Sequence, residues 1–359
     1  MTEFQRINAL LLSFRASMRN RNRRVAPPAK RDQADVLRVR YWYEGQRQRT
    51  GLATAYKLEQ HFEPESFRKQ DGITSNRCKW QRYAAGRHTP QAKLVARIDC
   101  RVPGSLQELQ HPLWAVLKHQ PSRATMSEAF LQQLKPDVQA VLFEPVGGIE
   151  VYWQRARTTV VLIRKLERIA SMDALAALTW LLREAIAQGN HKTAENLTRS
   201  LYTVLLMMGI EWQNRELAEP LLKLFAQRIL PLGTPPHRRF CMRGKDMLEY
   251  SAALNLIVYQ TTDGRRRSLT WLQRVHIMRR LLVGMTGFDV VHALAPQYIP
   301  AGTDVPAEVI HRLEQDEIWR QWGWRSINSV QPEPFPPAEL LIARATPGEA
   351  ASQITHRIK

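Results

Sequence analysis

The sequence predicts a mostly α-helical protein, and three observations support this fold class. Apolar residues recur every three or four positions through long segments, as in residues 172–188, where Leu175, Leu178 and Leu182 fall on one face. Glycine and proline residues separate these segments, as expected where helices end. The chain has 359 residues, of which 44% are hydrophobic and 10 are tryptophan, so buried cores for two or three domains are expected.

The net charge of the chain is strongly positive. Lys and Arg total 52 against 33 Asp and Glu, which gives +19 and a pI of about 10.3. Residues 1–50 hold 12 basic and 4 acidic groups and residues 51–100 hold 9 and 5, so the first hundred residues carry +12 of the +19. A polyanionic partner such as nucleic acid is therefore expected, contacted mainly by the N-terminal part of the chain.

Cysteine usage and hydropathy predict a cytoplasmic protein that does not cross a membrane. The three cysteines, Cys78, Cys100 and Cys241, form no C-x-x-C pair and no even framework, which fits a reducing compartment. The longest uncharged runs are residues 250–262 and 290–303. Both are shorter than the roughly 20 apolar residues that a membrane-spanning helix needs.

Residues 1–35 are predicted to form a short helix and a basic arm. Apolar periodicity places the helix at residues 4–18. The arm follows and contains Arg21, Arg23 and Arg24. Two interpretations of the arm stay open, because a run of arginines can be a solvated linker or can lie along phosphates or in a minor groove.

Residues 36–105 are predicted to form a helical domain. The helical pattern of residues 36–62 is interrupted at Gly51, and a turn follows later. We then expect a helix that Ser75 caps through its hydroxyl and that Gly86 closes in the left-handed conformation. Pro90 suits the first turn of the next helix, where a missing N–H costs nothing.

This predicted helix has an apolar face and a basic face. Trp80, Tyr83 and Ala84 are spaced three and four residues apart, so they share the side that packs inward. The residues expected to face the major groove of DNA are Arg77, Cys78, Lys79 and Arg82. Arg87 and Lys93 follow, and we expect them to contact phosphates.

The segment Tyr83-Ala-Ala-Gly-Arg-His-Thr-Pro90, followed by an apolar helix, resembles the end of the recognition helix in the lambda-repressor-like (Cro-type) helix-turn-helix family. The resemblance covers about residues 52–100 and implies a domain that binds duplex DNA. It places Trp80 at a buried position, and the base-facing positions fall on Arg77, Cys78 and Lys79. Ala84 replaces the acidic residue of the family, and the turn glycine is displaced to Gly72. An ordinary helical hairpin with a basic face is the alternative.

Three further segments are predicted after this domain. Residues 106–148 are expected to form a connecting helical layer, and residues 149–300 a helical array. The helices expected in the array span residues 158–170, 172–188 with Ser171 as the cap, 191–208, 215–229, 246–260 and 269–283. Residues 301–359 are expected to contain an acidic helix at 308–319 and a proline-rich tail.

No catalytic motif is present in the sequence. It lacks G-x-S-x-G, H-E-x-x-H, paired Cys and His ligand spacings, and the glycine patterns that bind nucleotide phosphates. We therefore expect no enzymatic activity, no cofactor and no metal ion. A nuclease built from dispersed carboxylates such as Asp137 and Glu144 is the open alternative.

Taken together, these features predict a bacterial protein that binds double-stranded DNA. The expected role is transcription regulation or assembly on DNA, for example in a mobile element or a defence system. The C-terminal helices are expected to bind protein partners or to form a homo-oligomer. Two alternatives stay open: a helical scaffold with no nucleic-acid role, and an RNA or single-strand binder that stacks bases on aromatic residues.

Overall fold

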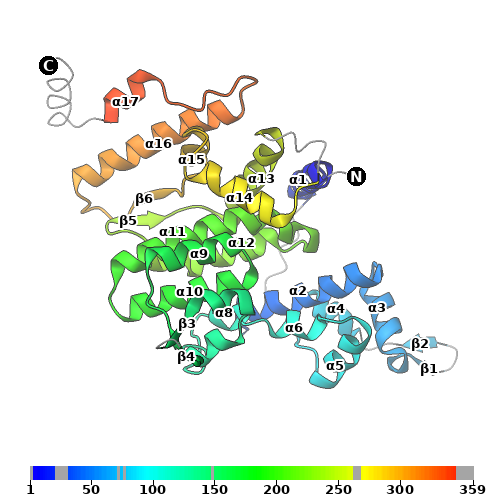
Figure 1. The fold of residues 1–359 in the computed structure, drawn as a ribbon. Coiled ribbons are helices and arrows are strands. Elements are labelled where there is room, and N and C mark those ends of the chain that lie inside the picture. The colour runs from blue at the N-terminus through cyan, green and yellow to red at the C-terminus, as the bar shows by residue number, and fades with distance from the viewer. Residues whose placement is uncertain are drawn as a thin grey trace, which may run out of the picture. The chain divides into compact units, whose positions relative to one another are not determined.

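The computed structural model describes residues 3–20, 31–70, 73–75, 78–146, 149–261 and 268–344. Within these residues the fold is mostly helical, as predicted, with α-helices α1 to α17 joined by short 3-10 turns (Figure 1). The strands form only two-stranded antiparallel sheets, β1–β2, β3–β4 and β5–β6. No described helix is both long enough and apolar enough to cross a membrane.

The chain divides into two units that interleave in sequence. The larger unit comprises Arg6–Gly233 and Arg243–Ala252, and the smaller one comprises Met1–Gln5, Thr234–Met242 and Ala253–Lys359. The predicted boundaries after residues 35, 105 and 148 all fall inside the larger unit. The predicted boundary after residue 300 falls inside the smaller one.

The first part of the larger unit is a group of short helices. The N-terminal helix α1 spans Glu3–Asn20. The helices of the group are α2 Gln33–Thr50, α3 Ala55–Phe62, α4 Lys79–Ala84, α5 Ala92–Arg101 and α6 Ser105–Gln110. Asp32 caps α2 by accepting a hydrogen bond from the backbone N–H of Ala34 at 2.8 Å. Gly51 closes α2 with a φ of 70°, and Thr54 then caps α3. The predicted helical segments and the break at Gly51 are therefore confirmed.

A β-hairpin separates α3 from α4, and the sequence analysis did not predict it. Its strands are β1 Arg68–Gln70 and β2 Ile73–Ser75, and Arg68 pairs with Ser75. The prediction that Ser75 caps a helix was wrong, because the β-branched residues of β2 extend the chain to this point and α4 begins only at Lys79. Pro90 also lies outside the first turn of α5, which begins at Ala92.

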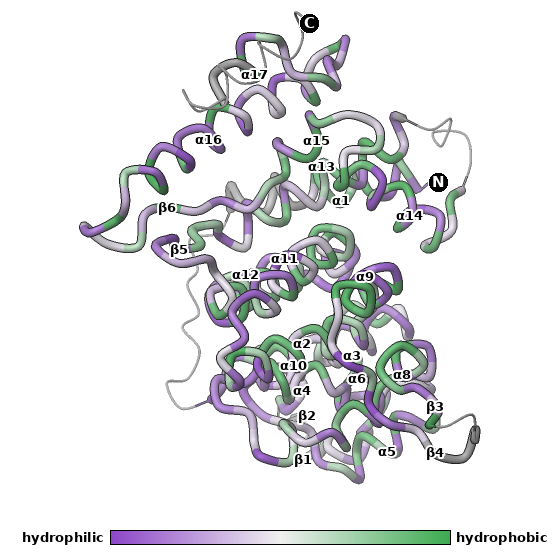
Figure 2. Tube along the Cα trace, turned by 60° about the vertical axis from the view of Figure 1, so that its left-hand side comes forward, coloured by the Kyte–Doolittle hydropathy of each residue, from purple (hydrophilic) through white to green (hydrophobic). Residues whose placement is uncertain are grey.

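The second part of the larger unit surrounds helix α10. Its elements are α7 Leu113–Val116, η2 Glu128–Gln133, α8 Pro136–Leu142, β3 Phe143–Val146, β4 Ile149–Arg155, α9 Val160–Ile169, α10 Met172–Ala187, α11 His191–Met208, η3 Gly209–Arg215 and α12 Ala218–Arg228. Ser171 caps α10 as predicted, and Leu175, Leu178 and Leu182 are buried. Because α10 is buried on nearly every side, it is the centre of this part. By contrast, α8 and α9 each show a hydrophobic and a hydrophilic side (Figure 2).

Ion pairs and strand pairing explain why the predicted boundaries do not separate the larger unit. Arg215 of η3 donates to Glu108 of α6 at 2.6 Å, and its guanidinium stacks on the ring of Tyr41 at 3.9 Å. The predicted boundary after residue 148 lies between β3 and β4, which pair with each other. Arg155 at the end of β4 forms an ion pair with Glu184 of α10. These contacts fix each part of the unit to the next.

The smaller unit contains the rest of the helical array and the acidic helix. Its elements are β5 Arg238–Phe240, α14 Trp271–Leu282, α15 Asp289–Ala293, β6 Tyr298–Pro300, α16 Ala307–Ile327 and α17 Ala338–Arg344, and α13 Gly244–Thr261 runs from the larger unit into it. The predicted acidic helix extends beyond residue 319, because Trp319 and Trp322 are buried and Gly323 lies against the backbone of α15. His292 of α15 contacts Trp319, with 4.5 Å between ring centroids.

Candidate nucleic-acid interface

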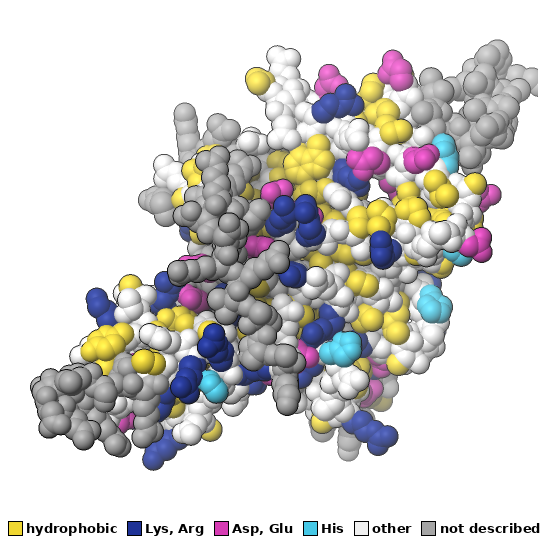
Figure 3. All heavy atoms as spheres, turned by 180° about the vertical axis from the view of Figure 1, so that it is seen from behind, with side chains coloured by type: hydrophobic (Ala, Val, Ile, Leu, Met, Phe, Trp, Pro, Cys, Tyr) yellow, Lys and Arg dark blue, Asp and Glu magenta, His cyan; other side chains and the backbone are white. Residues whose placement is uncertain are grey.

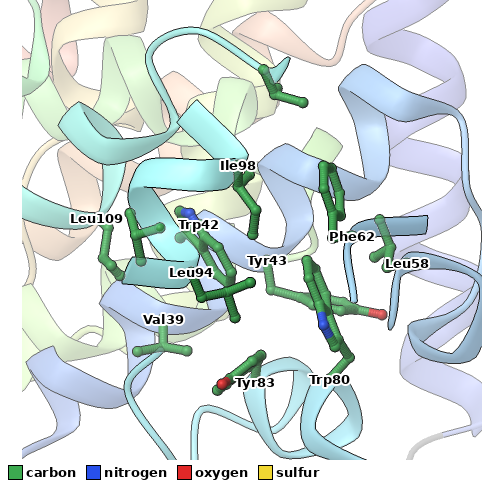
Figure 4. Packing of buried hydrophobic residues seen from close by; sticks show 12 residues of the cluster. Val39, Trp42, Tyr43, Leu58, Phe62, Trp80, Tyr83, Leu94, Ile98 and Leu109 are labelled. Atoms are coloured by element: carbon green, nitrogen blue, oxygen red, sulfur yellow. The ribbon is translucent and has the colours of Figure 1, made fainter. Parts of the chain in front are cut away.

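Helix α4 is held by a group of buried aromatic residues, which we call the aromatic core: Trp42, Phe62, Trp80 and Tyr83 (Figure 4). The rings of Phe62 and Trp80 stack with centroids 5.4 Å apart and planes 8° apart. Trp42 stacks on Trp80 at 5.6 Å and meets the edge of Tyr83. The prediction that Trp80 and Tyr83 form the apolar face is confirmed, and this face fixes α4 against α2 and α3.

Two buried carboxylates at the end of α3 bind the start of α4. Glu63 accepts hydrogen bonds from Trp80 Nε1 at 3.0 Å and from Lys79 Nζ at 2.9 Å. Glu59 accepts from the backbone N–H of Lys79 at 3.4 Å. Lys79 was expected to face the groove, but its ammonium is instead paired with Glu63, whose burial makes a charged partner necessary.

The same carboxylates contribute to a raised pKa of Tyr83. Burial, followed by the negative charges of Glu63 and Glu59, raises the pKa of Tyr83 to about 12. The phenol therefore stays neutral at physiological pH. Tyr83 is 6% exposed, so it contributes to packing and does not reach a ligand.

Cys78 differs from its predicted position on the groove-facing side. It lies before the first turn of α4 in the left-handed conformation, with a φ of 49°, and its side chain does not cap the helix. It is half-buried and belongs to the turn that enters α4. Four other predicted DNA contacts lie outside the described residues, and these are Arg21, Arg23, Arg24 and Arg77.

The turn after α4 closes in a defined geometry around Gly86. Gly86 has a φ of 67°, as predicted, and its N–H donates to Tyr83 O at 2.9 Å. The N–H of Arg87 reaches back to Arg82 O at 2.8 Å, which completes a Schellman motif. A Cβ at position 86 would lie 2.6 Å from the carbonyl oxygen of Val36 on α2. The turn is thus pressed against α2, and the place of Arg87 is fixed.

Three predicted contacts remain available to a ligand, and we call them the α4–α5 basic surface: Arg82, Arg87 and Lys93. All three are exposed, and within the described part of the chain none of their side chains makes a hydrogen bond or an ion pair. No Asp or Glu occurs between Asp71 and Asp99. Figure 3 shows Lys and Arg side chains gathered over the region of α2 to α6. Lys79 and Arg97 of this stretch pair with carboxylates of residues 63–65, whereas the charges of Arg82, Arg87 and Lys93 stay unpaired.

Two further cations border this surface: Arg31, from the predicted basic arm, and Arg38, which was not predicted to contact DNA. Arg31 and Arg38 both donate to Thr89 Oγ1, which lies in the turn before α5. The pKa of Arg31 is lowered, mainly by burial. The negative charge of Asp35 raises this pKa, and the positive charge of Arg38 lowers it. Arg38 carried no sequence signal of its own, because it lies among the apolar positions of α2 and only folding brings it to Thr89.

Potential metal ligands are scattered through the described residues. No cluster of three or more His, Cys, Asp or Glu side chains that could hold a metal ion occurs among them. Asp137 lies in the first turn of α8, and Glu144 lies on β3 opposite Gln154. The dispersed-carboxylate nuclease thus gains no support from this geometry.

The chain was also compared with known proteins. No family model, no curated protein and no solved structure matches it. The geometry of the α4–α5 basic surface is therefore the basis for inferring function.

Proposed function

We propose that this protein binds duplex DNA through the α4–α5 basic surface. The observation that carries the proposal is that Arg82, Arg87 and Lys93 are exposed and unpaired on a stretch without acidic residues, while the aromatic core fixes α4, which bears Arg82. Cations in such an arrangement gain from contact with phosphates, which release their counterions on binding. The same side chains form no hydrogen bond or ion pair within the described residues, so they are available to a ligand.

The dimensions of α4 suit the major groove. An α-helix with its side chains is about 10–12 Å in diameter and the groove is about 12 Å wide, so the groove admits α4, Lys79–Ala84. Arg82 would reach base edges, where guanine offers two acceptors to an arginine. Arg87 and Lys93 would contact the backbone and fix the register.

The order of the helices is compatible with the Cro-type resemblance. In that comparison α3 would be the supporting helix and α4 the recognition helix, and α5 would pack behind them. The β1–β2 hairpin stands where a helix-turn-helix has a short turn of three or four residues. We therefore propose a helix-turn-helix-like domain with an inserted hairpin, acting in regulation or assembly on DNA.

Binding of the purified full chain to duplex DNA, single-stranded DNA and RNA across a salt series tests the proposal. The test variant carries Arg82→Gln, Arg87→Gln and Lys93→Gln, which preserve helix propensity. The matched control removes three other exposed, unpaired cations of the larger unit, through Arg123→Gln, Lys192→Gln and Lys223→Gln. Both variants lower the net charge by the same amount, so a difference in their affinity for DNA shows that the position of the cations matters.

We expect the parent to prefer duplex DNA and the test variant to lose at least tenfold in affinity. The plot of the logarithm of the binding constant against the logarithm of salt concentration should become less steep by up to about 2.7, since each phosphate contact contributes about 0.9 to the steepness. The control should keep most of the affinity. Equal binding by the two variants would refute the proposed surface.

Single-strand and RNA binding is the less favoured candidate for this domain. Stacking of bases requires exposed rings, but Trp42, Phe62 and Trp80 are at most 1% exposed, and the partly exposed ring of Tyr56 on α3 already packs against Phe67. A preference for single strands in the same assay would overturn the proposal of duplex binding.

A further inference from the structure

Helix α9, in the larger unit, carries a second group of unpaired cations, which we call the α9 basic face: Arg164, Lys165 and Arg168. All three are exposed, and within the described residues their side chains form no ion pair or hydrogen bond. No acidic residue occurs between Glu150 and Glu167. Positive charge is therefore concentrated on one side of a ten-residue helix.

The packing of α9 fixes this face outward. Thr159 caps the helix, and Leu162, Ile163 and Leu166 are buried on the opposite side. Glu167, the one acidic residue of α9, is turned inward and is 8% exposed. It accepts a hydrogen bond from Ser200 Oγ at 3.0 Å. The carboxylate thus cannot neutralise the cations beside it in sequence.

Some exposed cations of this unit have a carboxylate partner three or four residues away. Arg199 pairs with Glu195 at 2.9 Å along α11, and Arg243 pairs with Asp246 at 3.0 Å. On α9, by contrast, Arg164 and Arg168 are like charges four residues apart, a spacing that weakens a helix. The α9 basic face thus costs the isolated protein stability, and an external anion would offset that cost.

We propose that the α9 basic face is a second phosphate-binding surface for the backbone of the same duplex DNA. This inference rests on the proposed function. Arg164 and Arg168 are about 6 Å apart along the axis of α9, and each strand of the duplex carries one phosphate per 3.4 Å of duplex axis, so the face spans one or two successive phosphates. Such contacts add affinity and orientation without reading sequence.

A membrane surface is a poorer fit to this helix. An amphipathic helix that binds lipid inserts its apolar face between the headgroups. The apolar face of α9 is already buried through Leu162, Ile163 and Leu166. The exposed side carries the three cations and, at its start, only Val160 and Val161 as exposed apolar residues. Two valines make a small apolar face for insertion between headgroups, so the exposed side suits a polyanion that is contacted from outside.

The test compares an Arg164→Gln, Lys165→Gln, Arg168→Gln variant with the control that lacks Arg123, Lys192 and Lys223. Affinity of the full chain is measured across a salt series on duplexes of two lengths, and on phosphatidylserine vesicles. Circular dichroism verifies that each variant is folded. We expect the α9 variant to lose at least tenfold on the longer duplex and to show a salt dependence whose slope is smaller in magnitude by about 1 to 2. The gain in affinity from lengthening the duplex should also be lost.

Each outcome separates this inference from the proposed function. If the α9 variant binds duplex DNA like the control while the variant of Arg82, Arg87 and Lys93 loses binding, the α9 inference fails and the proposed function stands. If only the α9 variant loses duplex binding, the α9 basic face is supported and the α4–α5 basic surface is not. Binding to the vesicles in preference to duplex DNA, lost in the α9 variant, would overturn the assignment to DNA. Absence of duplex binding by the parent would overturn both.

Discussion

Replacement of Gly86 by alanine tests whether the turn after α4 is pressed against α2. Gly86 has a φ of 67°, and a Cβ there would lie 2.6 Å from Val36 O and 2.7 Å from Val36 Cγ1. Gly51 has nearly the same conformation, with a φ of 70°, and also closes a helix, but a Cβ there would have no neighbour within 4 Å. The two glycines therefore differ in packing and share their backbone conformation.

The expected magnitudes follow from these two terms. An L-residue in the left-handed region costs about 1–2 kcal/mol relative to glycine, and this term applies to both Gly86→Ala and Gly51→Ala. Overpacking against the backbone of α2 adds about 1–3 kcal/mol at position 86 alone. We therefore expect the free energy of unfolding to fall by about 2–5 kcal/mol for Gly86→Ala and by about 1–2 kcal/mol for Gly51→Ala.

Urea denaturation of the full chain, followed by tryptophan fluorescence, measures the two losses. Hydrogen exchange at the amide of Arg87 adds a local readout, because this N–H donates to Arg82 O at 2.8 Å. Exchange should accelerate strongly in Gly86→Ala and little in Gly51→Ala. Equal losses of stability in the two variants would refute the close approach of the turn to α2.

Two further predictions concern the start of α4. Glu63→Gln should lower the free energy of unfolding by about 1.5–3 kcal/mol, because Lys79 and Trp80 lose a charged acceptor. The control, Glu65→Gln, removes the pair between Arg97 and a 60% exposed carboxylate and should cost under about 1 kcal/mol in the same urea assay. Similar costs for the two variants would contradict the role of Glu63. Because the pKa of Tyr83 is raised to about 12 in the fold, its contribution to stability is complete below the ordinary value near 10 and is lost as pH rises through 12. Tyr83→Phe should therefore reduce the slope of the urea midpoint between pH 10 and 12, and an unchanged slope would contradict the raised pKa.

Features that depend on near neighbours in sequence were predictable. The helix at 191–208 was predicted with the bounds that α11 has, and Ser171 caps α10 as expected. Gly86 closes α4 for the same reason, because helix periodicity and capping involve residues only three or four positions apart. The identity of the buried and exposed faces of α4 was likewise set by this spacing.

Two features were missed: a hairpin of very short strands, and a basic face that is marked in the sequence only by a lack of acidic residues. Strands β1 and β2 have three residues each, which is too few for an alternating pattern to stand out from a helix boundary. The α9 basic face was visible in the sequence only as a stretch without Asp or Glu between residues 150 and 167. The face is basic also because Glu167 is buried, and the burial of Glu167 depends on the packing of the folded chain.

The sequence by itself determined the helical fold class, most helix faces and the concentration of cations near α4. Only the tertiary structure decided which of these cations are available. Lys79 is neutralised by Glu63, which lies 16 residues earlier, and Glu108 binds Arg215 across 107 residues. The division into two units also depends on such pairings, since Phe4 packs on Tyr259. A charge is paired or free according to what folding brings within a few ångströms of it, and sequence separation carries little information about that distance.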